Sequence, residues 1–231
     1  MTDNWPKRPG RPRHIPQPKN QGLSPHDQVL DAAAFLFADQ GFAKTSTREI
    51  AERVGIRQAS IYYHFPNGKD DILTEVVSKS IRPTLDMVET VENLTEDPDT
   101  ALYLLAMIDV RTLADAPHNT GLLGMLPDVA DKVPEFAVER KELGAAYQRI
   151  GERAASKEVV ISTSGRLGAL ILVTVENVIN WIKDGDYKRD RSPDVIAASC
   201  LRVCGLDELA INEAAGAARV LLPQFEEERE Q

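Results

Sequence analysis

Hydrophobic residues recur at the spacing of an α-helix along the chain from residue 24 onward. In the first such stretch, Val29, Ala33, Leu36 and Phe37 fall three or four positions apart and so line one side of a helix. No stretch sustains the alternation of apolar and polar residues that a half-buried strand requires. The pattern therefore predicts an all-α protein.

Capping residues mark the beginnings of the first two helices. Ser24 followed by Pro25 is typical of a helix start, and Gly41 is typical of the residue that follows a helix end. Ser46, with Glu49 three positions later, forms a capping box. This box predicts the start of a second, short helix.

Glycine and proline delimit the next two helices. Gly55 is expected to end the second helix after about two turns. A third short helix is predicted over 58–65, where the Pro-Asn-Gly sequence at 66–68 stops it. A longer fourth helix is predicted over about 69–90, with a kink at Pro83.

Further helical stretches fill the rest of the chain. Asp97-Pro98-Asp99 is expected to open a helix that ends near Ala114. Beyond it, helices are predicted near 120–131, 134–155, 163–184, 193–204 and 208–229.

Residues 1–23 differ in composition from everything that follows. They are rich in proline and glycine, contain almost nothing apolar, and carry basic side chains. Such a segment cannot bury enough apolar surface to form a core, so we expect a flexible basic arm.

Charge is divided unevenly along the chain. The net charge is −9, but residues 1–69 carry 10 basic and 6 acidic side chains, a net +4. Residues 70–231 carry 17 basic and 30 acidic side chains, a net −13. This asymmetry is typical of a small DNA-facing segment attached to an acidic body.

Composition and spacing exclude several classes of protein. The apolar run 167–175 is far shorter than the roughly 20 residues of a membrane span, and no apolar stretch follows the basic N-terminus as in a secretory signal. We therefore expect a cytoplasmic protein without a membrane partner. Cys200 and Cys204 are interpreted as two buried hydrophobes, and the histidines are scattered, so no metal is predicted. Without a phosphate loop or a clustered Ser/His/Asp set, we expect no catalytic residues and no cofactor.

Two short helices joined by a tight turn at Gly55, after a longer supporting helix, match a helix-turn-helix. In that unit the second short helix lies in the major groove of DNA. The spacing alone equally allows a small helical bundle with an unrelated role.

The residues of this segment decide between the two. The sequences GFAKTSTREIA (41–51), VGI (54–56) and IYYHF (61–65), and Lys69 followed by Asp71-Ile72-Leu73, occur in order and near the spacing of one known family. Over residues 24–73 the chain resembles the TetR family of transcriptional regulators.

The resemblance implies a domain organisation and a function. An N-terminal domain, 24–84, would hold the helix-turn-helix at about 46–65, and a larger helical domain, 85–231, would bind a ligand and dimerise. The implied function is a homodimeric repressor that binds a palindromic operator in double-stranded DNA and is released by a small molecule. The alternative is a DNA-binding activator or architectural regulator without a small-molecule inducer.

The start of the third helix carries the side chains best suited to contact bases. Arginine prefers guanine and glutamine prefers adenine, so Arg57 and Gln58 are the first candidates, with Ser60 and Tyr63 behind them. For Arg57, a contact with phosphate alone is an equal alternative. Arg57 and Ala59 stand where the family usually has serine and glycine, so the operator sequence cannot be transferred from relatives.

A second set of candidates suits the DNA backbone. It lies at a helix start, where exposed amides and hydroxyls favour a phosphate. It comprises Thr45, Ser46, Thr47 and Arg48. The resemblance assigns further backbone contacts to Tyr62, His64 and Lys69. For His64, a packing or capping role is an equal alternative.

The arm adds a third candidate element. The segment 8–13, RPGRPR, partly resembles an AT-hook, with Pro9 in place of the first arginine. Arginines on a flexible arm can enter a narrow, A·T-rich minor groove, so Arg11 and Arg13 are candidates. Loose attraction to phosphates, or no role, are the alternatives.

The resemblance also implies a dimer interface and a ligand pocket. In the family two late helices of each subunit form the interface, here about 163–184 and 208–229, although their apolar stripes are equally typical of a core within one chain. Candidates for the pocket of an unidentified ligand are polar or polarizable residues within apolar helices, each of which also fits a packing or surface role. They are Tyr103, Met107, Arg111, His118, Met125, Phe136, Tyr147, Asn177 and Trp181.

Overall fold

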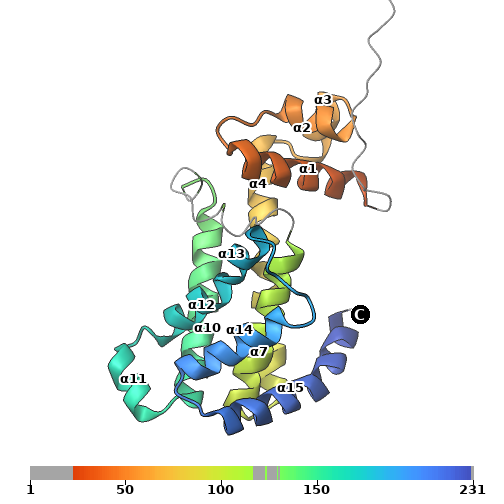
Figure 1. The fold of residues 1–231 in the computed structure, drawn as a ribbon. Helices are drawn as coiled ribbons and strands as arrows, with labels where there is room; N and C mark the ends of the chain where they lie inside the picture. Colours follow the sequence, from red (N-terminus) through yellow and green to blue (C-terminus); the bar gives the residue numbers. More distant parts are fainter. Residues whose placement is uncertain (1–22, 117–122, 124–128, 130, 230–231) are drawn as a thin grey trace, which may run out of the picture.

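The computed structural model of this chain describes residues 23–116, 123, 129 and 131–229. Every regular element within those residues is a helix, so the all-α prediction is confirmed. Figure 1 shows a small helical unit at one end of the molecule and a larger helical body at the other. Residues 1–22 and most of the helix predicted near 120–131 lie outside the described residues.

The small unit follows the local signals of the sequence. It consists of α1 (Pro25–Gln40), α2 (Thr47–Val54) and α3 (Gln58–His64), and α4 (Lys69–Ser78) leads from it into the body. Ser24 caps α1 as predicted, because its hydroxyl accepts a hydrogen bond from the amide of Asp27 at 3.1 Å. Phe37, Ile50 and Ile61 are fully buried between the three helices.

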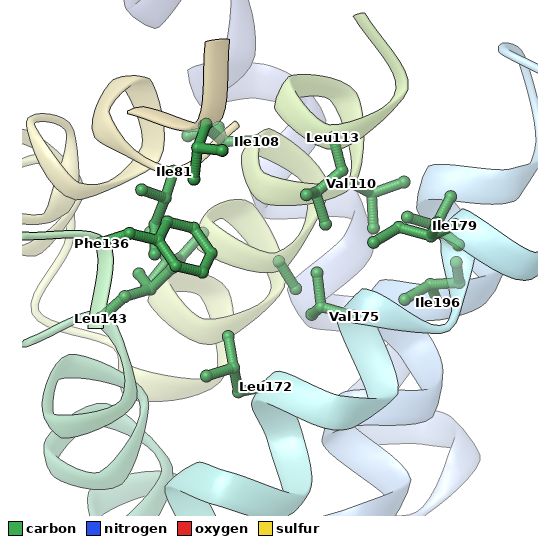
Figure 2. Packing of buried hydrophobic residues seen from close by; sticks show 14 of the residues in the cluster. Ile81, Ile108, Val110, Leu113, Phe136, Leu143, Leu172, Val175, Ile179 and Ile196 are labelled. Atoms are coloured by element: carbon green, nitrogen blue, oxygen red, sulfur yellow. The ribbon is translucent and has the colours of Figure 1, made fainter. Parts of the chain in front are cut away.

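The body is arranged around one buried helix. Its helices are α5 (Arg82–Leu85), α6 (Val88–Leu94), α7 (Pro98–Asp115), α10 (Pro134–Ala154), α11 (Lys157–Thr163), α12 (Leu167–Glu176), α13 (Val178–Lys183), α14 (Ser192–Val203) and α15 (Glu208–Arg229). Of the 18 residues of α7, 13 are buried, because α10, α12, α14 and α15 all pack against it. Figure 2 shows Val110 and Leu113 of α7 near Ile179 and Ile196 in this core.

The fourth helix differs from its prediction. The sequence pattern predicts one kinked helix over 69–90, whereas the structure has three segments, α4, α5 and α6. Pro83 lacks the amide hydrogen that would bond to the carbonyl of Lys79, which disfavours a regular helix here. The chain breaks at 79–81, and Pro83 lies in the first turn of α5, where no such bond is needed. The hydroxyl of Ser80 instead donates to the carbonyl of Val77 at 2.7 Å and helps to close the end of α4.

The helix predicted over 163–184 is also wrong in its extent. The chain forms α11 first and then turns at Ser164 and Gly165, whose φ angles are 49° and 75°. These positive values interrupt a right-handed helix. The apolar pattern resumes at Leu167, where α12 begins, and α13 follows it closely.

The crossing of α10 and α12 is unusually close. A Cβ atom added at Gly168 would lie 2.6 Å from the backbone nitrogen of Gln148, and it would also strike the carbonyl oxygen of Gly144. The amide of Gly168 donates to the side-chain oxygen of Gln148 at 2.6 Å. Glycine is therefore required at 168 for the two helices to approach.

Two sequence interpretations concern apolar segments of the body. Cys200 and Cys204 are both buried and unbridged, as predicted for small hydrophobes. Among the described helices, no single one is long and apolar enough to cross a membrane. Only the pair Lys157–Thr163 and Leu167–Lys183, bent by 87°, passes that test jointly.

Candidate nucleic-acid interface

The capping box at the start of α2 is formed as predicted. The hydroxyl oxygen of Ser46 accepts a hydrogen bond from the amide of Glu49 at 3.2 Å, and the carboxylate of Glu49 accepts one from the amide of Ser46 at 2.8 Å. Hydrogen bonds from the hydroxyl and amide of Ser46 hold the pKa of Glu49 below its usual value. The position of the α2 N-terminus is thus fixed by its own residues.

Gly55 sets the angle between α2 and α3. It has φ 86° and ψ 22°, the left-handed conformation that favours glycine. Its amide and that of Ile56 both donate to the carbonyl of Ala51, at 2.9 and 3.0 Å. The turn predicted from the sequence is therefore a left-handed C-cap, and it places α3 across α2.

The predicted base-contacting residues share the exposed side of α3. Arg57, Gln58, Ala59, Ser60 and Tyr63 are all exposed, and the side chain of Ile61 is buried beneath them. Tyr63 is 84% exposed, which is extreme for a large aromatic residue. This combination leaves polar side chains and one aromatic ring available on a rigid helix.

Arg57 stands at the head of this surface. It is the N-cap residue of α3, in an extended conformation, and its side chain makes no capping hydrogen bond. The usual capping residue would use its side chain on the helix amides. Arginine at this position instead leaves its guanidinium uninvolved in the cap.

A small hydrogen-bond network joins the starts of α2 and α3. The side-chain amide of Gln58 donates to the hydroxyl of Thr47 at 2.9 Å, and that hydroxyl lies 3.3 Å from the hydroxyl of Tyr62. Arg48 is exposed and pairs with Glu52 at 3.0 Å. Predicted base contacts and predicted phosphate contacts therefore form one continuous surface.

Lys69 and Thr45 have structural partners in the described residues. The ammonium of Lys69 donates to the carbonyls of Phe42 and Thr45, at 2.8 and 2.7 Å, and lies 4.2 Å from the centre of the Phe42 ring. Burial lowers its pKa. Thr45 is 2% exposed and donates its hydroxyl to the carbonyl of Gly41 at 2.9 Å. In this structure both residues fasten the turn before α2 to the start of α4.

His64 lies among aromatic rings at the end of α3. Its ring centre is 5.0 Å from that of Tyr63 and 5.9 Å from that of His26, edge to face in both cases. His26 in turn stacks on Phe65 at 4.7 Å. The ring of His64 is therefore engaged in packing, while its exposed side remains on the α3 surface.

Sequence reasoning underestimated Gly68. It used this glycine only as part of the stop signal at 66–68, but Gly68 has φ 66° and a Cβ atom there would lie 3.0 Å from Cε1 of Tyr62. The glycine thus lets the Tyr62 ring lie close against the turn. Lys44, exposed beside the capping box, was also not singled out. Arg11 and Arg13 lie outside the described residues.

The predicted pocket residues lie in different environments of the body, and their role stays a prediction. Tyr103, Met107 and Tyr147 are buried in the core, Asn177 is exposed, and Trp181 is half-buried. Arg111 lies half-buried on α7, and His118 and Met125 lie outside the described residues. Phe136 lines both an open groove and a small inner cavity.

The inner cavity is also lined by a buried carboxylate that the sequence analysis missed. Asp109 of α7 is 2% exposed and accepts hydrogen bonds from the hydroxyls of Tyr147, at 2.9 Å, and Thr84, at 3.2 Å. Burial raises its pKa to about 7, and the negative charge of Glu176 adds to the rise. Burial of a carboxyl group is costly unless it is hydrogen-bonded, and such groups with strongly shifted pKa values are candidates for functional sites.

Comparison with known families finds a match for the N-terminal unit. The model described as "Bacterial regulatory proteins, tetR family" matches residues 29–76. The match covers α2 and α3, with their capping box and Gly55 turn, and most of α1 and α4.

Similarity to individual proteins extends beyond the small unit into the body. AmtR of Mycobacterium smegmatis is 32% identical, over 90% of this chain and 98% of AmtR, with a TM-score of 0.78. The repressor KstR2 of Mycolicibacterium smegmatis is 39% identical over 62 residues, 27% of this chain and 30% of KstR2. The fatty acid metabolism regulator of Bacillus subtilis is 25% identical over 181 residues, 74% of this chain and 88% of that protein. The alignment with KstR2 therefore spans less than a third of that repressor.

Proposed function

This chain belongs to the TetR family of bacterial regulatory proteins, and on that basis we propose that it is a ligand-responsive repressor. In this proposal it binds a palindromic operator in double-stranded DNA as a homodimer and is released by a small molecule. The observation that carries the proposal is the surface of α3, where Arg57 and Gln58 lead an exposed, polar helix on a rigid support.

The exposed N-terminal end of α3 supports a role in the major groove. Recognition helices contact base edges with their first residues, and a bidentate arginine–guanine or glutamine–adenine pair contributes roughly 1–3 kcal/mol of discrimination. The side chain of Arg57 makes no capping hydrogen bond, and Gln58 lies beside Thr47 at the start of α2. We assign base contact to these two residues.

Contacts with the DNA backbone are assigned to the start of α2 and its neighbours. The first amides of a helix have no partner within the helix, and the helix dipole favours an anion there. Thr47 and Arg48 lie at that point. Lys44 is exposed shortly before them in the sequence, and Tyr62 is exposed with its hydroxyl against that of Thr47. Such contacts fix the register of the protein on DNA without sequence preference.

Homodimerisation is proposed through the two late helical regions. The inner sides of α12 and α15 are used within the chain, since Leu167, Ile171 and Ala218 are fully buried. Their outer sides still expose apolar residues: Leu170 is 49% exposed on α12 and Val220 is 71% exposed on α15. Two recognition helices, about 34–36 Å apart, would then contact two half-sites.

Release by a small molecule is proposed as a shift between two states of the dimer. A ligand lowers operator affinity only by as much as it binds the released state more tightly. The similarity of the body to AmtR along nearly its full length, and the cavity beside Asp109, support a regulatory role for this domain.

The test is binding of DNA from the region upstream of the gene, measured by fluorescence anisotropy. We expect specific retention by the wild type and a loss of at least about tenfold in specific affinity for the double variant Arg57→Ala/Gln58→Ala. Alanine is used at both positions because it removes the charge and the hydrogen-bonding groups together.

Lys157→Ala is the matched control for loss of a basic side chain, because Lys157 is exposed on α11, at the end of the body away from α3 (Figure 1). The control should bind as the wild type does. Equal affinity and selectivity of the double variant and the wild type would overturn the proposal.

A further inference from the structure

The cavity beside Asp109 lies inside the body, between three helices and the segment that links α4 to α5. It is lined by Ser80, by Asp109 and Leu113 of α7, by Phe136 and Leu143 of α10, and by Glu176 of α12, among others. Its volume is about 20 Å³. A cavity of roughly 10–15 Å³ holds one water molecule, so this one accepts a single group of about that size.

The charges around the cavity are unbalanced. Glu176 is neutralised by Arg140, whose guanidinium donates to both carboxylate oxygens at 2.8 Å. Asp109 receives only the hydroxyls of Tyr147 and Thr84, and among the described residues no cationic side chain pairs with it. When Asp109 is ionised, the cavity therefore carries one uncompensated negative charge.

A larger groove shares part of its wall with this cavity. It has a volume of about 870 Å³ and runs between α10 and α12, where Ala137, Gly144, Ala145 and Ala169 give it small, apolar walls. Phe136 and Leu172 line both the groove and the inner cavity. In Figure 2 these two side chains and Leu143 extend toward the same space beside α7.

The ion pair between Arg140 and Glu176 spans the same boundary. Arg140 lines the groove, whereas Glu176 lines the inner cavity. Phe136, Leu172 and this ion pair thus separate an open groove from a small acidic chamber. A small group could therefore pass from the groove into the cavity only where these side chains move aside.

We propose that the effector of this protein is a primary amine, whose ammonium group enters the inner cavity against Asp109 while its apolar body lies in the groove between α10 and α12. The inference rests on the proposal that the chain responds to a small molecule. An ammonium group is close to a water molecule in size and supplies the missing positive charge. A carboxylate of the same size would meet two acidic side chains, and a larger head group would not fit.

The test uses n-butylamine, n-butanol and butyrate as probes of equal length and different charge. Each is titrated into the full-length protein without DNA, at matched ionic strength, by isothermal calorimetry and by thermal unfolding. We expect saturable binding of butylammonium with a rise in Tm, binding of butanol at least about tenfold weaker, and no binding of butyrate. Equal or tighter binding of butyrate or butanol would overturn the inference.

Two pairs of variants locate the binding. Asp109→Asn should weaken butylammonium binding at least about tenfold, whereas Asp115→Asn, on the same helix but exposed and paired with Arg189, should not. Ala137→Trp fills the exposed groove without touching the core and should also weaken binding, whereas Ala43→Trp, exposed in the small unit, should not. Undiminished amine binding by Ala137→Trp and by folded Asp109→Asn would place the amine elsewhere and end the proposal.

The outcome is independent of operator binding. Absence of sequence-specific DNA retention would contradict the proposed function while the amine titration stood. Absence of amine binding in a protein that retains its operator would contradict this inference alone.

Discussion

The ammonium of Lys132, just before α10, lies 3.8 Å from the carboxylate of Asp70 in the first turn of α4. The same ammonium lies 5.5 Å from the centre of the Phe42 ring, which belongs to the small unit. The body and the DNA-binding unit therefore meet at a charged contact, in addition to their covalent connection through α4.

Removal of this contact should affect DNA binding more than folding. Both side chains are substantially exposed, and exposed ion pairs contribute only about 0.2–1 kcal/mol. We expect Lys132→Ala to leave Tm almost unchanged but to weaken operator binding about two- to fivefold, because the recognition helices would be less well fixed relative to the body.

Anisotropy titrations of Lys132→Ala, Asp70→Asn and the double variant form the appropriate cycle. If the two substitutions act through one contact, the double variant should be no weaker than the worse single variant. Fully additive losses would show that the contact does not couple the two units.

The capping box of α2 offers a second prediction. Ser46→Ala removes the oxygen that accepts the amide of Glu49, and loss of such a cap costs about 1 kcal/mol. We expect a lower Tm and weaker operator binding, since α2 presents the proposed phosphate contacts. Ser162→Ala, an exposed serine near the end of α11, is the control and should change neither. A Tm unchanged by Ser46→Ala would argue against a stabilising role of the cap.

The close crossing of α10 and α12 gives a third prediction. Gly168→Ala would force the new methyl group against the backbone of α10, so we expect destabilisation of about 1–3 kcal/mol. Gly216→Ala is the matched control, because a Cβ atom there meets nothing within 4 Å on α15. Alanine is the better helix former, so the control should be neutral or stabilised by up to about 1 kcal/mol. Chemical denaturation of both variants measures the contrast.

The sequence predicts the small unit far better than the body, and the reason is local chemistry. The capping residues of α1 and α2 act on amides and dihedral angles within a few residues of themselves. Their roles can therefore be predicted without knowledge of the fold, as for Ser24, Gly41, Ser46 and Gly55. The pattern indicates an interruption near Pro83, but it could not show that α4 already ends at Ser78 and that Pro83 lies in the first turn of α5.

The candidate pocket could not be predicted in the same way. Asp109 lies in an apolar run, and only the approach of Tyr147 and Thr84 from distant parts of the chain distinguishes it from a surface aspartate. Tyr103 and Met107, chosen for polarity within apolar helices, are buried in the core, and whether they contact a ligand stays a prediction. Side-chain type indicates what a residue can do, whereas convergence depends on tertiary packing.

Asp109 also makes stability depend on pH in an unusual direction. Its pKa is raised in the folded protein to about 7, from a usual value near 3.8, so between these limits the folded state binds more protons than the unfolded state. The free energy of unfolding should therefore fall as pH rises from about 4 to about 7, and then level off with respect to this group.

Asp27, Glu49, Glu92 and Glu208 have lowered pKa values and act oppositely, since their stabilisation is lost as pH falls through the acid range. The difference between the wild type and Asp109→Asn isolates the Asp109 contribution. Urea denaturation at about pH 5, 6 and 7 should show the wild type losing stability relative to the variant. Parallel profiles would show that Asp109 does not titrate in this range.

The hydrogen bond from Thr84 to Asp109 has one more consequence. Thr84 belongs to α5, which directly follows α4 along the chain. The helix α4 in turn connects the body to the small unit that contains α3. An ammonium group that donates hydrogen bonds to Asp109 would compete with the Thr84 hydroxyl for the same carboxylate. If the proposed amine binds there, this link between α5 and α7 weakens, so a group no larger than a water molecule acts on the segment that follows α4.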